Sequence, residues 1–122
     1  MNNIDRWFIL MAIVYALGGM ILGLWMGMKE DYTHVPLHAH INLVGWATMA
    51  LFGVLYRLYP KLAGSRLALP HFALFALGTP VMLFGIPIAH SGGSPLLAVA
   101  GSFAVLAGMA LFLVIFARRG TT

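Results

Sequence analysis

The sequence contains no cysteine, which excludes disulfide bonds, thiolate metal sites and iron–sulfur clusters. It is also poor in charge, because 8% of its 122 residues are charged where an average soluble domain has about 25%. Its only carboxylates are Asp5, Glu30 and Asp31. A pump or transporter that works through carboxylates in the membrane therefore has no side chains to use. No serine–histidine–acid triad or phosphate-binding glycine loop is present, so hydrolytic chemistry is not expected.

Hydrophobic residues, by contrast, make up 61% of the chain and form four long apolar stretches. A helix needs about 20 apolar residues to cross the ~30 Å hydrocarbon layer of a bilayer. The four stretches cover residues 7–28, 37–59, 69–90 and 95–117. We therefore predict an all-α fold, a single membrane domain over residues 1–122 with four transmembrane helices. The connections are short, so consecutive helices should be antiparallel neighbours.

Basic residues are distributed unequally between the two sides of the predicted membrane. Only Lys29 falls on one side, and the other side carries Arg6, Arg57, Lys61, Arg66, Arg118 and Arg119. By the positive-inside rule, this places both termini in the cytoplasm, which we expect to be that of a bacterium with the chain in its inner membrane. The net charge of +4 thus reflects topology, and no nucleic-acid partner is expected.

Small residues recur at four-residue spacing in two of the predicted helices. The first set is Gly19, Gly23 and Gly27, and the second is Ala100, Ala104 and Gly108. Such stripes let neighbouring helices approach closely. Helix packing is the favoured interpretation, and a flat haem resting on the glycine stripe is the alternative.

Four of the five histidines map to the membrane edge opposite the termini. His34 precedes the second predicted helix, His38 and His40 lie in its first turns, and His90 ends the third. Histidine is the commonest metal ligand and also binds haem iron, and polar groups at membrane depth are costly and usually functional. Taken singly, His34 and His71 are expected to be hydrated polar caps at the interface.

Helix geometry separates the two central histidines. At 100° per residue, His38 and His40 point about 200° apart, so they should serve two neighbouring sites rather than one ion. Asn42 continues the face of His38 and would orient an imidazole through its amide. His34 would share that face only if the helix began before Pro36, and the residue preceding a proline disfavours helix.

Residues 38–46 (HAHINLVGW) resemble the ligand-bearing helices of haem–copper oxidase catalytic subunits and their nitric-oxide-reductase relatives. In that family, a histidine-x-histidine pair opens a helix on the outer side and serves two haems. The resemblance implies that His40 binds a low-spin haem, of b type, and that His38 faces the reactive site. It also implies a copper ligand at His90, and Lys29 and Trp46 beside the haem propionates.

The family fold has twelve helices in three arcs of four, and this chain resembles a single arc. A homotrimer would rebuild the twelve-helix ring. The chain has only His90 where the family has an adjacent histidine pair, and no tyrosine matches the family's cross-linked one. The resemblance therefore implies a haem protein without a complete oxygen-reducing site, and it leaves open whether the chain is an oxidoreductase.

The leading hypothesis is a homo-oligomeric membrane haem protein that transfers electrons, with a redox partner, or binds a diatomic gas such as O2 or NO. Copper near His90 is compatible with this hypothesis. Two alternatives stay open at this point. One is a haem-free copper- or zinc-binding protein that uses His34, His38, His40 and His90. The other is a structural or assembly subunit whose histidines are interfacial caps.

Overall fold

A computed structural model describes residues 3–119, and within this range it contains helices and turns but no strand. The helices are α1 (Ile4–Lys29), α2 (Val35–His40), the π-helical segment η1 (Ile41–Thr48), α3 (Met49–Leu58), the 3-10 turn η2 (Pro60–Gly64), α4 (Ala68–His90) and α5 (Leu96–Arg119). Because α2, η1 and α3 are continuous, the described chain has four helical spans long and apolar enough to cross a membrane. Their ends agree with the predicted ends to within three residues, which confirms the all-α, four-span prediction.

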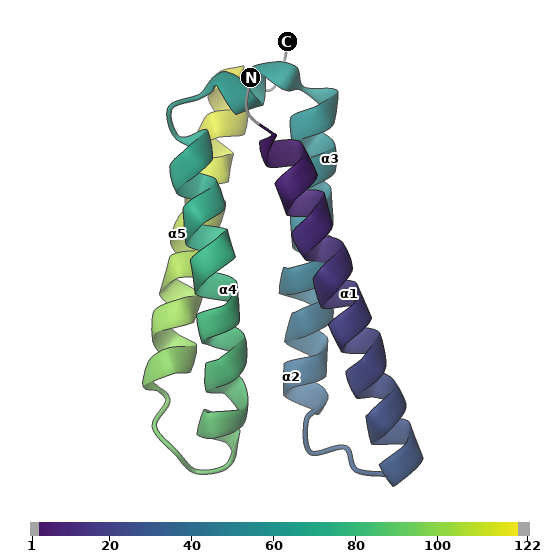
Figure 1. The fold of residues 1–122 in the computed structure, drawn as a ribbon. Helices are drawn as coiled ribbons and strands as arrows, with labels where there is room; N and C mark the ends of the chain where they lie inside the picture. The colour runs from purple at the N-terminus through teal and green to yellow at the C-terminus, as the bar shows by residue number, and fades with distance from the viewer. Residues whose placement is uncertain (1–2, 120–122) are drawn as a thin grey trace.

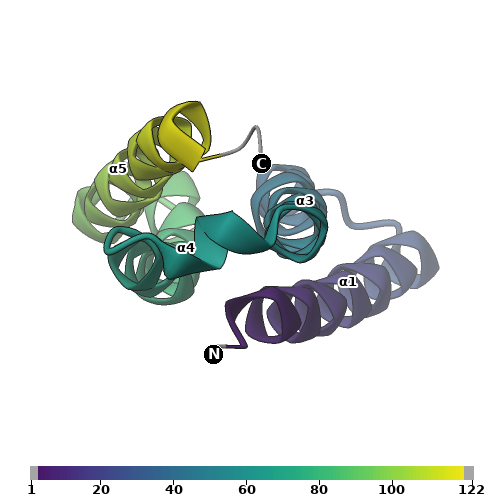
Figure 2. The ribbon, with the colours of Figure 1, turned by 90° about the horizontal axis from the view of Figure 1, so that it is seen from above.

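The spans form two hairpins, one of α1 with the second span and one of α4 with α5 (Figures 1 and 2). Both ends of the described chain lie at one end of the molecule, which we call the termini end. The connections 30–34 and 91–95 lie at the other, here called the histidine end because His34, His38, His40 and His90 are there. Toward the histidine end, α1 leans away from α4 (Figure 1).

Helices α4 and α5 pack through glycines spaced seven residues apart, Gly78 and Gly85 on α4 and Gly101 and Gly108 on α5. A Cβ atom at Gly78 would lie 2.7 Å from the Ala104 Cβ. The predicted close approach is thus confirmed at Ala104 and Gly108, whereas Ala100 is exposed.

On α1, the predicted close approach is confirmed at two of the three glycines. A Cβ atom at Gly19 would lie 3.0 Å from Asn42 Oδ1, and one at Gly23 would lie 2.9 Å from His38 Nε2. A Cβ atom at Gly27 would have nothing within 4 Å, so that position faces open space. Gly19 and Gly23 therefore leave room for the side chains of Asn42 and His38 on the second span.

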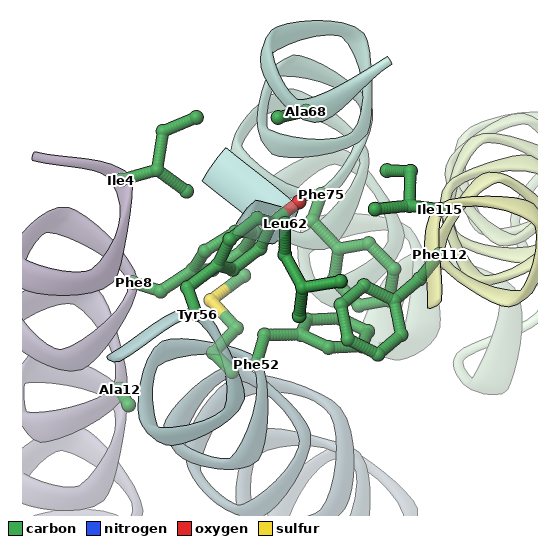
Figure 3. Packing of buried hydrophobic residues seen from close by; sticks show 11 residues of the cluster. Ile4, Phe8, Ala12, Phe52, Tyr56, Leu62, Ala68, Phe75, Phe112 and Ile115 are labelled. Carbon is green, nitrogen blue, oxygen red and sulfur yellow. The ribbon is translucent and has the colours of Figure 1, made fainter. Parts of the chain in front are cut away.

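An aromatic cluster at the termini end joins the two hairpins (Figure 3). Phe8 comes from α1, Phe52 and Tyr56 from α3, Phe75 from α4 and Phe112 from α5. The rings of Phe52 and Phe75 meet edge to face with centroids 4.7 Å apart, a geometry that adds to simple burial. Elsewhere the spans expose many large apolar side chains, such as Leu17, Phe84 and Leu113, as contact with lipid requires.

Charged residues are confined to the ends of the spans. At the termini end, the Arg57 guanidinium and the Asp5 carboxylate form an ion pair of 3.1 Å between α3 and α1. In the connection at the histidine end, the Thr33 hydroxyl lies 2.6 Å from the Asp31 carboxylate and holds the pKa of that carboxyl below its usual value. The charge distribution is therefore that of a membrane protein with six of its seven basic residues at one end.

Candidate functional site

His40, the last residue of α2, is exposed and its ring is fixed by one hydrogen bond. Its Nδ1 lies 2.7 Å from the carbonyl oxygen of Pro36. A carbonyl can only accept, so Nδ1 carries the proton and donates it. In the neutral ring, the lone pair is therefore on Nε2, which makes no hydrogen bond with a described residue. This is the tautomer in which a backbone-anchored histidine binds a metal through Nε2.

The ring of His38 lies in a different environment, between α1 and the amide of Asn42. The Asn42 Nδ2 atom donates to the His38 carbonyl oxygen at 3.0 Å and lies 3.3 Å from His38 Nε2. Because the amide nitrogen has two protons, His38 Nε2 is the acceptor of the second. On the α1 side, Gly23 lies so close to the ring that a Cβ atom there would be 2.9 Å from His38 Nε2. His38 and His40 thus do not converge, and Nε2 of His38 is already occupied.

A π-helical segment follows directly after the two histidines, a feature that the residue pattern did not predict. Within η1, the Thr48 hydroxyl donates to the carbonyl oxygen of Leu43 at 2.6 Å. Gly45 lies in the same segment, and a Cβ atom there would lie 2.6 Å from Cγ of Tyr15. Single π-helical turns inside α-helices occur frequently at functional sites. Here the π turn brings Tyr15 of α1 onto the backbone of the second span.

His34 immediately precedes α2 and is half-buried, with its ring centroid 6.4 Å from that of Trp25. The helix begins at Val35, so the expectation that the residue before Pro36 would stay outside the helix is wrong. The physical reason is that Pro36 lies in the first turn, where its missing N–H removes no hydrogen bond. The amide of His38 accordingly donates to the carbonyl of His34 at 2.8 Å.

The remaining predicted residues are exposed. Lys29 ends α1, Trp46 lies in η1 with 41% of its surface exposed, and His90 ends α4. Across residues 3–119, no three or more histidine, aspartate or glutamate side chains form a group that could hold a metal ion. In this range, no such group supports copper at His90 or the four-histidine copper or zinc site, and both stay predictions.

His71 differs from the sequence-based expectation, because it is fully buried rather than a hydrated cap. Helix α4 begins at Ala68 and turns His71 into the aromatic cluster, where its Nδ1 lies 2.9 Å from the Tyr56 hydroxyl. Its Nε2 has no hydrogen-bond partner in the described chain, and its ring meets Phe52 edge to face at 4.4 Å. The sequence did contain a signal for this burial, because aromatic rings recur at four-residue spacing on two consecutive helices. They are Phe52 and Tyr56 on the first, and His71 and Phe75 on the second.

Replacing Gly23 with alanine is expected to displace the His38 ring, because the new Cβ would lie 2.9 Å from Nε2. The hydrogen bond from Asn42 should then lengthen or break. Histidine ¹⁵N NMR of the detergent-solubilised protein would report a changed Nε2 shift for His38. Gly27→Ala is the matched control, since nothing lies within 4 Å at that position. An unchanged His38 signal in Gly23→Ala would contradict the described packing.

The histidine end thus offers one imidazole, His40, that is oriented and ready to bind, and a second, His38, that is held between helices by Asn42. Such an arrangement can supply one axial nitrogen to a metal or haem iron per chain. The chain was compared with protein-family models, with curated proteins and with solved structures, and no match was found.

Proposed function

We propose that this chain is a membrane haem protein in which Nε2 of His40 binds the iron. The observation that carries the proposal is the hydrogen bond from His40 Nδ1 to the Pro36 carbonyl, which leaves Nε2 free on an exposed ring. A backbone partner of this kind orients a ligating imidazole and raises its basicity. The resemblance of residues 38–46 to haem–copper oxidase subunits favours haem, of b type, over a bare metal ion.

In this proposal, the haem supplies an iron that cycles between the ferrous and ferric states or binds a diatomic gas. The chain's own residues position it. His40 would bind the iron. Trp46, in the π-helical segment that follows α2, would provide an exposed aromatic side chain, and Lys29 would provide a positive charge for the haem propionates. Because His38 faces α1, a second histidine ligand would come from another copy of the chain.

A homotrimer, in which each chain forms one arc of a twelve-helix ring, would bring such copies together. Ligation by two histidines would suit electron transfer to and from a redox partner, whereas ligation by His40 alone would suit binding of O2 or NO. Both termini would lie in the cytoplasm, since six of seven basic residues are at that end. The haem would then lie near the outer surface.

The test is the visible spectrum of protein expressed with added haem and copper and purified in detergent. Wild type should show a Soret band that shifts on reduction, and His40→Ala should bind at least tenfold less haem per chain. His90→Ala is the matched control, because His90 is exposed at the same end. Full haem content in His40→Ala would overturn the proposal. Colourless wild type containing copper or zinc would support the haem-free alternative.

A further inference from the structure

A cleft of about 450 Å³ lies between α1, the second span and α4. Its lining includes Tyr15 and Gly18 of α1, Leu37 of α2, and Pro80, Leu83 and Pro87 of α4. All of these residues belong to the candidate membrane spans, so a ligand would enter from the hydrocarbon layer. Its volume falls in the range typical of small-molecule sites.

Tyr15 is the one lining side chain that has a polar group. It lies near the middle of α1, and its ring is held against Gly45 of η1. Its hydroxyl makes no hydrogen bond with any residue in the described part of the chain. An unpaired hydroxyl costs free energy at hydrocarbon depth, so a phenol in an apolar cleft favours a ligand that accepts its hydrogen bond.

Helix α4 contributes only apolar residues to the lining, namely Pro80, Leu83, Phe84 and Pro87. The cleft wall is therefore apolar apart from the side chain of Tyr15.

We propose that this cleft binds a lipid-soluble quinone. The apolar walls suit a hydrophobic ring and tail, and the Tyr15 hydroxyl would donate to a quinone oxygen. A phospholipid acyl chain would fill the same volume but would leave Tyr15 unpaired. The proposal goes beyond haem binding and does not depend on it, since none of the lining residues is His40.

The test is photolabelling of the full-length protein in nanodiscs with an azido-benzoquinone that has a decyl tail, followed by peptide mapping. Gly18→Leu should reduce labelling at least tenfold, because Gly18 lines the cleft and has open space where the leucine would extend. Gly27→Leu is the matched control on the same helix, with equally open space but outside the cleft, and should label like wild type. Tyr15→Phe should weaken binding about two- to tenfold through the lost hydrogen bond.

Equal labelling of Gly18→Leu and Gly27→Leu, or a label on peptides remote from the cleft, would overturn the proposal. Full labelling of Tyr15→Phe, together with a co-purified phospholipid that excess quinone does not displace, would assign the cleft to an acyl chain instead. The same measurements on His40→Ala separate the two proposals. Labelling that persists in haem-free protein supports the quinone site whether or not the haem proposal survives.

Discussion

Replacing Gly85 with alanine is expected to destabilise the α4–α5 hairpin by about 1–3 kcal/mol, the usual cost of overpacking a tight interface. A Cβ atom at Gly85 would lie 2.6 Å from the carbonyl carbon of Leu97 and 2.7 Å from Cα of Ala98. These are backbone atoms, so no side-chain rotation can relieve the contact and the two helices must separate. Gly85→Leu should prevent stable packing altogether. Unfolding in mixed micelles, titrated with dodecyl sulfate, would measure the loss.

Gly27→Ala serves as the reference for this experiment, because nothing lies within 4 Å of its Cβ position. Alanine favours helix over glycine by roughly 0.5–1 kcal/mol, so this variant should match or exceed wild type. The difference between the two variants isolates the contact with α5 from helix propensity. Equal stabilities for Gly85→Ala and Gly27→Ala would mean that α4 and α5 do not pack through their glycines.

The positions of the four spans could be predicted because they depend on length and hydropathy alone. Span ends such as Lys29 and His90 also carry a polar residue where hydrocarbon gives way to water, which explains the close agreement. The π-helical segment could not be predicted in this way. Its extra residue per turn coincides with the contact of Tyr15 against Gly45, which involves another helix and leaves no periodic signal in residues 41–48.

The candidate site shows the same division between local and tertiary causes. The different surroundings of His38 and His40 follow from 100° per residue along α2, a local property that the sequence contains. That Asn42 lies beside His38 follows from the same local spacing and was predicted, whereas the close approach of Gly23 to His38 depends on how α1 packs. The burial of His71 has a tertiary cause too. Its position close to the end of a span indicates contact with water, but its ring packs against aromatic residues of three other helices.

Tyr56→Phe is expected to destabilise the protein by about 1–2 kcal/mol, even though it removes one oxygen atom. The lost hydroxyl is the only hydrogen-bond partner of the His71 ring in the described chain, so both ring nitrogens would be unpaired among phenylalanines. Leaving a buried polar group unsatisfied costs about 1–3 kcal/mol in soluble proteins. Hydrogen bonds between membrane helices average nearer 0.6 kcal/mol, which places the expectation in the lower part of that range.

The double variant Tyr56→Phe/His71→Leu separates the hydrogen bond from packing. His71→Leu alone leaves the Tyr56 hydroxyl unpaired, whereas the double variant leaves no polar group between α3 and α4 within the aromatic cluster. Its loss of stability should therefore be smaller than the sum of the single losses by about 0.5–2 kcal/mol, as for a directly bonded pair in a double-mutant cycle. Additive losses would show that the bond between Tyr56 and His71 adds nothing to the packing of the rings.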